Sequence, residues 1–275
     1  MSTEITNKLK NNGISDNTIY YWGYMYFLGK SYIVPHLTKL GVFRAGDNVA
    51  EIGSAEGGVL HSFLDAGSKN ALGSDIAVDR LAEGKKISEI LNYKVNYTKH
   101  DIINQDPEPS WIEQYNLVIL RDVIEHLDNP EKAIKNIKKM LKKGGYLYIT
   151  FPPFQSAYGG HQHTLAGNII TKLPFIHLLP KNIFFHLIKS GRSQDIEEVK
   201  RLKDIRFSPE KMEEIAINSG YEIYYKEFFI IRPVYKMKFG LNPLKLNYGT
   251  NLSFIRNFIS QEAAYILRKK IEGNY

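Results

Sequence analysis

An acidic side chain stands shortly before a turn of very small residues, directly after a short apolar stretch. The acid is Glu51. The small residues that follow it are Gly53, Ser54, Ala55 and Gly57. A strand that runs into such a turn lets the backbone pass close to a ligand, and a helix that begins near Gly58 presents unpaired N–H groups there. The pattern predicts a ligand site at the end of this strand.

A second acid, Asp75, ends another apolar stretch at residues 71–75. It follows the glycine turn by about 20 residues, the spacing at which an acid reaches the ribose hydroxyls of a nucleotide in a βαβ unit. Glu51 precedes the turn, where it would repel a pyrophosphate and suit a cationic ligand. The two acids together predict a site for a positively charged nucleoside.

The order Glu51-x-Gly53-x-Ala55-x-Gly57 resembles motif I of the class I methyltransferases, which bind S-adenosylmethionine. The resemblance covers about residues 46–153. After the glycine turn and Asp75 come a polar segment at 99–102, a strand and turn at 115–127, and a helix, a Lys-Lys-Gly-Gly turn and a strand at 129–149. Ala55 replaces the usual middle glycine, but it is small enough to keep the turn tight.

The resemblance implies which residues hold the cofactor. The turn from Glu51 to Gly57 would hold its methionine and ribose portions, and Asp75 with its neighbour Ile76 the ribose hydroxyls. Asp101 with Ile102 would contact the adenine. The demethylated product, S-adenosylhomocysteine, would occupy the same site.

Residues outside these motifs complete the expected cofactor site. Arg121 and Asp122 stand at the end of the fourth strand. The N-terminal segment is crowded with aromatic residues, namely Tyr20, Tyr21, Trp22, Tyr24, Tyr26 and Phe27. Aromatic faces suit a sulfonium cation. We expect Tyr21 to reach the cofactor while most of the cluster packs a helix on the sheet.

Three histidines lie where an acceptor would meet the methyl group. His126 follows the fourth strand, and His161 and His163 flank Gln162 after the fifth strand. A hydroxyl must lose its proton near the transition state, and histidine, with an ordinary pKa near 6.5, suits this role. We expect a histidine of this group to act as general base. A structural role stays open, above all for His126.

A metal site is the alternative at the same loop. His161 and His163 are two residues apart, so on an extended loop both would point the same way. No cysteine or carboxylate stands next to them, and Asp122 or Glu125 could complete a site only through folding. The sequence therefore predicts that no metal is required.

Apolar strands alternate with amphipathic helices from residue 46 onward, which is typical of α/β proteins. We expect a Rossmann-like, doubly wound, mostly parallel seven-stranded sheet with helices on both faces. Residues 1–45 would form a helical segment over the site, residues 46–153 and 207–275 the cofactor-binding core, and residues 154–206 a helical substrate-binding cap after the fifth strand.

The last third of the chain has fewer signals. Ser208 and Pro209 are a good helix start, so a helix is expected to about residue 219, followed by a strand at 221–231. Beyond it we expect a last strand that the sequence does not place and a helix from about 254 to 270.

Charge and composition bear on whether the chain binds nucleic acid. The net charge of +7 could attract nucleic acid. However, the six lysines between Lys132 and Lys143 lie opposite an apolar stripe and are expected to be one solvated helix face. Pro152-Pro153-Phe154 follows the fifth strand, whereas the base-gripping motif of similar composition follows the fourth. We therefore expect no nucleic-acid partner.

Compartment signals are few. The chain has no cysteine, which fits a cytoplasmic protein, and shows no signal peptide or membrane-spanning stretch.

The resemblance and the histidines lead to one functional prediction. The chain would be a methyltransferase that uses S-adenosylmethionine to methylate a hydroxyl of a small molecule, such as a sugar, a nucleotide-linked sugar or a secondary metabolite. Transfer to nitrogen or carbon is the first alternative. A non-catalytic module that only binds the cofactor is the second.

Overall fold

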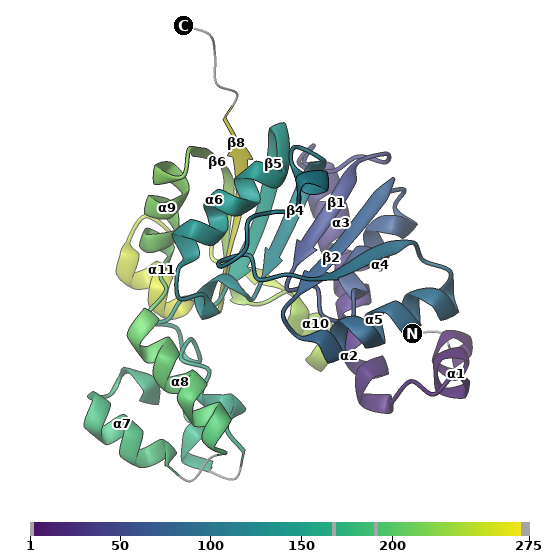
Figure 1. Ribbon diagram of the computed structural model, residues 1–275. Helices are drawn as coiled ribbons and strands as arrows, with labels where there is room; N and C mark the ends of the chain where they lie inside the picture. The colour runs from purple at the N-terminus through teal and green to yellow at the C-terminus, as the bar shows by residue number, and fades with distance from the viewer. Residues whose placement is uncertain (1–2, 167–168, 190–191, 271–275) are drawn as a thin grey trace, which may run out of the picture.

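The computed structural model describes residues 3–166, 169–189 and 192–270. In these residues an eight-stranded sheet forms the centre, and helices cover both sides (Figure 1). The strands are β1 (Asn48–Ile52), β2 (Asn70–Asp75), β3 (Val95–Lys99), β4 (Tyr115–Arg121), β5 (Leu141–Phe151), β6 (Tyr221–Ile231), β7 (Leu244–Lys245) and β8 (Glu262–Lys269). Their order in the sheet is β3-β2-β1-β4-β5-β8-β6-β7.

Five strands, β1 to β5, are parallel. From β1 the chain adds β2 and β3 on one side and then crosses to add β4 and β5 on the other, so the strand order reverses between β1 and β4. Ligands of such sheets bind beyond the carboxyl ends of the strands at this point. Glu51 lies near the end of β1 and Arg121 ends β4. Side chains alternate along a strand, so Glu51 shares its face with Val49 and Arg121 shares the same face with Ile119.

Two helices cover each main face of the sheet. On one face, α6 (Pro130–Met140) and α9 (Pro209–Asn218) pack on Ala50, Leu120 and Ile149. On the other, α3 (Val34–Lys39) and α4 (Gly58–Asp65) pack on Val49 and Ile119. The helix α5 (Val78–Leu91) contacts β2 and β3. The doubly wound α/β architecture predicted from the sequence is confirmed.

The N-terminal residues fold as helices α1 (Thr3–Asn11) and α2 (Asp16–Leu28), followed by a short π-helix (Gly29–Ile33) that leads into α3. Trp22 of α2 is fully buried and donates a hydrogen bond from Nε1 to Nδ1 of His61 in α4, at 2.9 Å. A Cβ atom at Gly58 would collide with the backbone of α2, so this glycine permits the close contact between α2 and α4. The contact fixes α2 beside the amino end of α4.

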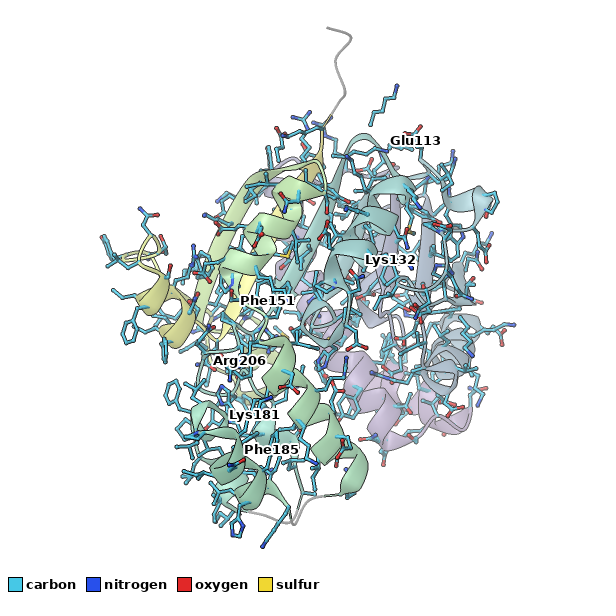
Figure 2. All side chains as sticks on the ribbon, turned by 60° about the vertical axis from the view of Figure 1, so that its left-hand side comes forward. Glu113, Lys132, Phe151, Lys181, Phe185 and Arg206 are labelled. Carbon is cyan, nitrogen blue, oxygen red and sulfur yellow. The ribbon has the colours of Figure 1, made fainter. Side chains whose placement is uncertain are left out.

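The segment after β5 forms a separate helical group, which we call the insertion (residues 152–206). Its helices are the 3₁₀ turns η4 (Gln162–Thr164), η5 (Ile169–Lys172) and η6 (Ile176–Leu178) and the α-helices α7 (Lys181–Ile188) and α8 (Ser193–Ile205). It has an apolar cluster of its own, with Leu165, Ile176, Phe184, Ile188 and Val199. Figure 2 shows Lys181 and Phe185 in this group beyond Phe151, the end of β5.

Two sequence predictions for the last third hold, and one is wrong. Ser208 caps α9 by accepting a hydrogen bond from the backbone N–H of Lys211, and the strand at residues 221–231 is β6. The predicted helix at 254–270 is incorrect: α11 spans only Ser253–Ile259, and residues 262–269 form β8 between β5 and β6. A central strand is buried on both faces and shows no alternation, so its Ala-rich apolar run resembled a helix.

The strand count also differs from the expected seven. The additional strand, β7, is a two-residue edge strand that pairs with β6. The remaining short elements are the 3₁₀ turns η2 (Pro109–Trp111) and η3 (Ile124–His126) and the helix α10 (Val234–Phe239). No helix in residues 3–166, 169–189 and 192–270 is both long and apolar enough to cross a membrane.

Candidate active site

The glycine turn after β1 has the backbone that its sequence predicted. Gly53 and Gly57 both have φ of +75°, where glycine is favoured. A Cβ atom at Gly53 would collide with the side chain of Val123, and one at Gly57 with the hydroxyl of Tyr97. The turn therefore packs too closely for side chains at either position.

Glu51 lies buried behind this turn, with 3% of its surface exposed. Burial raises the pKa of its carboxyl to about 8, although Arg121 lowers it. Its Oε2 atom has no hydrogen-bond partner among the residues that the structure describes. A buried carboxylate without a partner favours a cationic ligand, so the residue fits the predicted ligand charge.

Asp75 joins the end of β2 to the glycine turn. Its Oδ2 atom accepts from the backbone N–H of Ala55 and its Oδ1 atom from that of Ala77, both at 2.9 Å. Each carboxylate oxygen can accept a second hydrogen bond, so both can still receive ribose hydroxyls. Ile76 beside it is 68% exposed.

Asp101 follows β3 and closes a tight turn. Its carboxylate accepts hydrogen bonds from the backbone of Ile103 and from the backbone and side chain of Asn104, and these bonds hold its pKa below the usual value. The side chain of Ile102 is buried in the core. This turn stands at the carboxyl edge of the sheet, next to the end of β2.

Arg121 and Asp122 lie between the glycine turn and a cavity, which both residues line. Arg121 is buried, and its guanidinium lies 3.4 Å from the sulfur of Met25 and 3.4 Å from Asp122. Asp122 accepts a hydrogen bond of 2.6 Å from Arg232, which also donates to Glu262 at 2.9 Å. Arg232 thereby links the ends of β4, β6 and β8.

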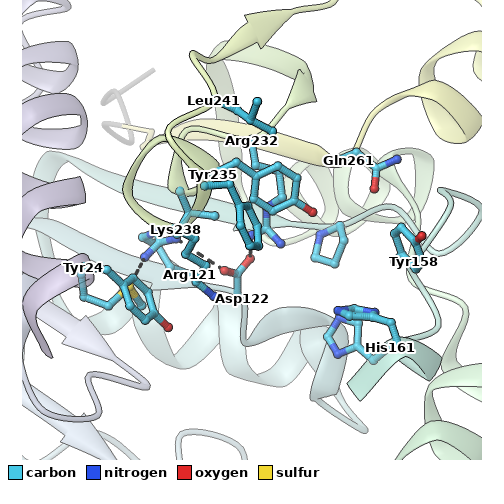
Figure 3. Close-up of a pocket in the computed structure, with 15 residues that line it drawn as sticks. Tyr24, Arg121, Asp122, Tyr158, His161, Arg232, Tyr235, Lys238, Leu241 and Gln261 are labelled. Carbon is cyan, nitrogen blue, oxygen red and sulfur yellow. Dashed lines mark hydrogen bonds and ion pairs between the residues drawn. The ribbon is translucent and has the colours of Figure 1, made fainter. Parts of the chain in front are cut away.

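The cavity has a volume of about 570 Å³ and lies over the ends of β4 and β5 (Figure 3). Its walls come from α2, the insertion, the segment after β6 and the turn before β8. They are formed by Tyr24, Met25, Arg121, Asp122, Pro152, Tyr158, His161, His163, Arg232, Val234, Tyr235, Lys238, Phe239, Leu241 and Gln261. Such a volume suits a small molecule.

Several of these lining residues were not found from the sequence. Arg232, Tyr235 and Lys238 follow β6, and only the place of β6 and β8 in the sheet brings them beside β4. From the aromatic cluster, Tyr24 lines the cavity, and burial raises its pKa to about 12. Tyr21 is not among the lining residues; it is 38% exposed and contacts the ring of Tyr24 edge-on.

The three predicted histidines meet on one side of the cavity. His161 and His163 both line it, and the ring of His126 lies 4.8 Å from that of His161. Burial lowers the pKa of His161 to about 3, and burial also lowers that of His163. His126 lies behind His161, with Nδ1 2.6 Å from Oε1 of Glu198 in α8.

Glu125 completes this group. It is 3% exposed, and neither carboxylate oxygen has a hydrogen-bond partner in the described part of the chain. Burial raises its pKa to about 7, partly offset by His126. The sequence noted Glu125 only as an acid that folding could bring to the histidines.

A profile of the methyltransferase domain family matches residues 24–180, more than half of the chain. The chain belongs to this family. The methyltransferase match includes the end of α2, the glycine turn, β1 to β5 and the histidine loop. S-adenosylmethionine is therefore the methyl donor. Three features fit it: the close-packed glycine turn, the Oε2 atom of Glu51 that has no hydrogen-bond partner in the described residues, and the Asp75 oxygens that can each accept a further hydrogen bond.

Curated relatives of this methyltransferase act on different acceptors. It is 24% identical over 123 residues to the tRNA U34 carboxymethyltransferase of Campylobacter concisus, covering 45% of this chain and 40% of that protein. It is 31% identical over 94 residues to the ubiquinone biosynthesis O-methyltransferase of Hydrogenovibrio crunogenus, covering 34% and 38%. The chain thus spans less than half the length of these relatives.

A solved structure has the same fold. Phosphoethanolamine N-methyltransferase 2 of Haemonchus contortus, in complex with S-adenosylmethionine, superposes with a TM-score of 0.54 at 16% identity, covering 86% of this methyltransferase and 52% of that chain. At this identity the likeness shows the fold alone.

Proposed function

We propose that this methyltransferase methylates a hydroxyl group of a small molecule bound in the cavity, with His163 as general base. The observation that carries the proposal is the position of the cavity. Arg121 and Asp122, beside the glycine turn, line it together with His161 and His163. An acceptor there would lie between the cofactor residues and a proton acceptor.

The residues of the chain have distinct tasks in this proposal. Bound S-adenosylmethionine supplies an electrophilic methyl group on a sulfonium. Glu51 would offer its carboxylate to the cationic end of the cofactor, Asp75 would hold the ribose, and Asp101 the adenine. The walls of the cavity orient the acceptor, and such positioning provides most of the acceleration in a displacement of this kind.

His163 is better placed as the base than the other two histidines. It lines the cavity and is exposed to solvent, so it can pass a proton on to water. His126 is engaged by Glu198, and His161 lies beside Glu125. The neutral form of His163, which a base requires, is favoured by the partial desolvation of its ring in the cavity wall and by the nearby cations of Lys172, Arg232 and Lys238.

The excess of positive charge in the cavity walls favours an acceptor that carries an anionic group. Arg121, Arg232 and Lys238 outnumber the single acid Asp122 in its walls. Lys238 lies with Nζ 4.4 Å from the centre of the Tyr24 ring, and it has no ion pair within the described residues. We propose an acceptor with an anionic group, such as a nucleotide-linked sugar, in preference to a neutral one.

The same geometry favours a small acceptor over nucleic acid. The excess cations lie inside a cavity, whereas Lys135 and Lys139 of the lysine-rich helix α6 are half-exposed and paired with Glu131 and Asp106. We also propose a cytoplasmic location, since a chain without cysteine fits a reducing compartment.

The first test is calorimetric titration with S-adenosylmethionine and S-adenosylhomocysteine, with NAD as the control. We expect the two sulfur nucleosides to bind and NAD not to bind. A screen with radiolabelled methyl donor then compares hydroxylated acceptors with and without a phosphate, and with amino analogues. Methylation of amino analogues alone would refute the hydroxyl acceptor, and absence of cofactor binding by folded protein would favour a non-catalytic role.

A further inference from the structure

Glu125 has an environment that the proposed reaction leaves unexplained. Its carboxylate is buried at the turn η3 after β4, and both oxygens lack a hydrogen-bond partner within residues 3–166, 169–189 and 192–270. An unpaired buried carboxylate is costly, and buried acids are normally paired or coordinate metals.

Two imidazoles from different elements converge on this carboxylate. The Nε2 atom of His126 lies 3.8 Å from Oε1 of Glu125, and the Nε2 atom of His161 lies 4.0 Å from it. The possible ligand atoms of the three residues all lie within 4.8 Å of one another. These separations are too long for hydrogen bonds but leave space for an ion between the atoms.

A second carboxylate orients one of these imidazoles. Oε1 of Glu198 lies 2.6 Å from Nδ1 of His126, and since a carboxylate accepts, Nδ1 carries the proton and the lone pair is left on Nε2. Arg201 holds Glu198 through hydrogen bonds of 2.8 to 3.0 Å and donates to the carbonyl oxygen of His126 at 2.6 Å. Carboxylates that hold the second nitrogen of a ligating histidine are typical of metal sites.

We propose that Glu125, His126 and His161 bind one divalent first-row transition metal ion at the wall of the acceptor cavity. Two imidazole nitrogens and one carboxylate suit ions such as Zn²⁺, Mn²⁺ or Co²⁺ better than Mg²⁺, which prefers oxygen ligands. Metal–ligand distances of about 2.0–2.2 Å require the ligand atoms to close by less than about 1 Å. The metal site considered from the sequence was His161 and His163, which Asp122 or Glu125 could complete through folding, whereas the structure groups His161 with Glu125 and His126.

The position of the site suggests its use. His161 lines the cavity, and three protein ligands leave coordination positions open, as in catalytic metal sites. An ion there would lower the pKa of an acceptor hydroxyl that reached it, and the released proton would pass to His163 or to water. This use rests on the proposed function, but metal binding itself does not.

The test is metal titration of chelator-treated full-length protein. Co²⁺ is added while its visible absorption is recorded, with competition by Zn²⁺ and with Mg²⁺ as the oxygen-seeking comparison. We expect one Co²⁺ per chain in the wild type. Glu125→Gln, His126→Ala and His161→Ala should each weaken binding by at least about 10-fold, and Glu198→Gln by about 10-fold or more.

His163→Ala is the matched control, because it removes a histidine of the same loop outside the three ligands. It should bind Co²⁺ as the wild type does, and calorimetric affinity for S-adenosylmethionine should show that every variant is folded. Absence of stoichiometric Co²⁺ binding, unchanged binding by Glu125→Gln, or loss of binding in His163→Ala alone would overturn the site. Stoichiometric binding without hydroxyl methylation would refute the proposed function and leave the metal site standing.

Discussion

The buried carboxyl of Glu51 illustrates how one residue couples stability to ligand binding. In the ligand-free chain, burial favours the protonated form, and its pKa rises from 4.5 to about 8. A cationic ligand would favour the ionised form instead. Protonation in the free chain and a bound cation are therefore two alternative ways to avoid an uncompensated buried charge at Glu51.

This carboxyl predicts a pH dependence of stability. Because the folded pKa lies above the unfolded one, the stabilisation by the neutral acid is complete below about pH 4.5 and is lost as the pH rises through about 8. We expect the melting temperature of ligand-free wild type, relative to Glu51→Gln, to fall between pH 5 and about 8.5. Melting curves of both proteins measure this, and a constant difference across that range would contradict it.

Gly53 gives a second prediction at the residue scale. Gly53→Ala adds a Cβ atom that must displace Val123, in addition to the cost of a positive φ. Gly13 also has a positive φ, but a Cβ atom there meets open space. We expect Gly13→Ala to cost about 1 kcal/mol of unfolding free energy and Gly53→Ala about 1–3 kcal/mol more, with weakened cofactor binding.

Denaturant unfolding and calorimetry would measure both effects. Adding Val123→Ala to Gly53→Ala should recover part of the lost stability, because it removes the atoms that collide. Equal losses in the two glycine variants would show that conformation alone decides the cost.

At the scale of elements, Arg232 connects strands that are distant in the sequence. It donates to Asp122 after β4 and to Glu262 at the start of β8, and it follows β6. Burial alone would raise the pKa of both acids, and the guanidinium opposes this shift in each. The guanidinium of Arg232 thus joins the ends of β4, β6 and β8 at the wall of the cavity.

Removal of this guanidinium should be costly. Arg232→Met leaves the buried acid Glu262 without its cation and the partly exposed Asp122 with Arg121 alone, and we expect a loss of about 3–5 kcal/mol in unfolding free energy. The double variant Arg232→Met/Glu262→Gln should lose less, because one of the uncompensated charges is gone. Lys181→Met, which breaks an exposed pair with Asp204, is the control and should change stability little. Similar losses in both single variants would refute the bridging role.

At the scale of the whole molecule, the residues proposed to bind the cofactor and the histidine loop belong to different packing units. The glycine turn, Asp75 and Asp101 stand on the sheet, whereas Leu165, directly after the histidine loop, is fully buried in the cluster of the insertion. Phe184 of α7 fills the same cluster. Cofactor binding and acceptor positioning should therefore respond separately to mutation.

Phe184→Ala tests this separation. The cavity left in the insertion should loosen the loop with His161 and His163, so turnover of an acceptor should fall by at least about 10-fold, since displacements of about 1 Å can cost more. Affinity for S-adenosylmethionine, measured by calorimetry, should stay within about twofold, because additivity is expected between distant sites. A parallel loss of cofactor affinity would show that the two units are coupled.

The sequence by itself determined the doubly wound sheet, the glycine turn with Glu51 and Asp75, the helix start at Ser208 and the place of the histidine loop after the fifth strand. These features depend on local patterns, namely hydrophobic periodicity, the small size of turn residues and helix capping. Each pattern involves only residues that are close together in the chain. The tertiary structure alone decided that residues 262–269 are a central strand, that Arg232 and Lys238 line the cavity, and that Glu125 lies close to both His126 and His161. Each depends on elements far apart in the chain, and their pairing follows from the packing of the whole core, which no short stretch of sequence contains.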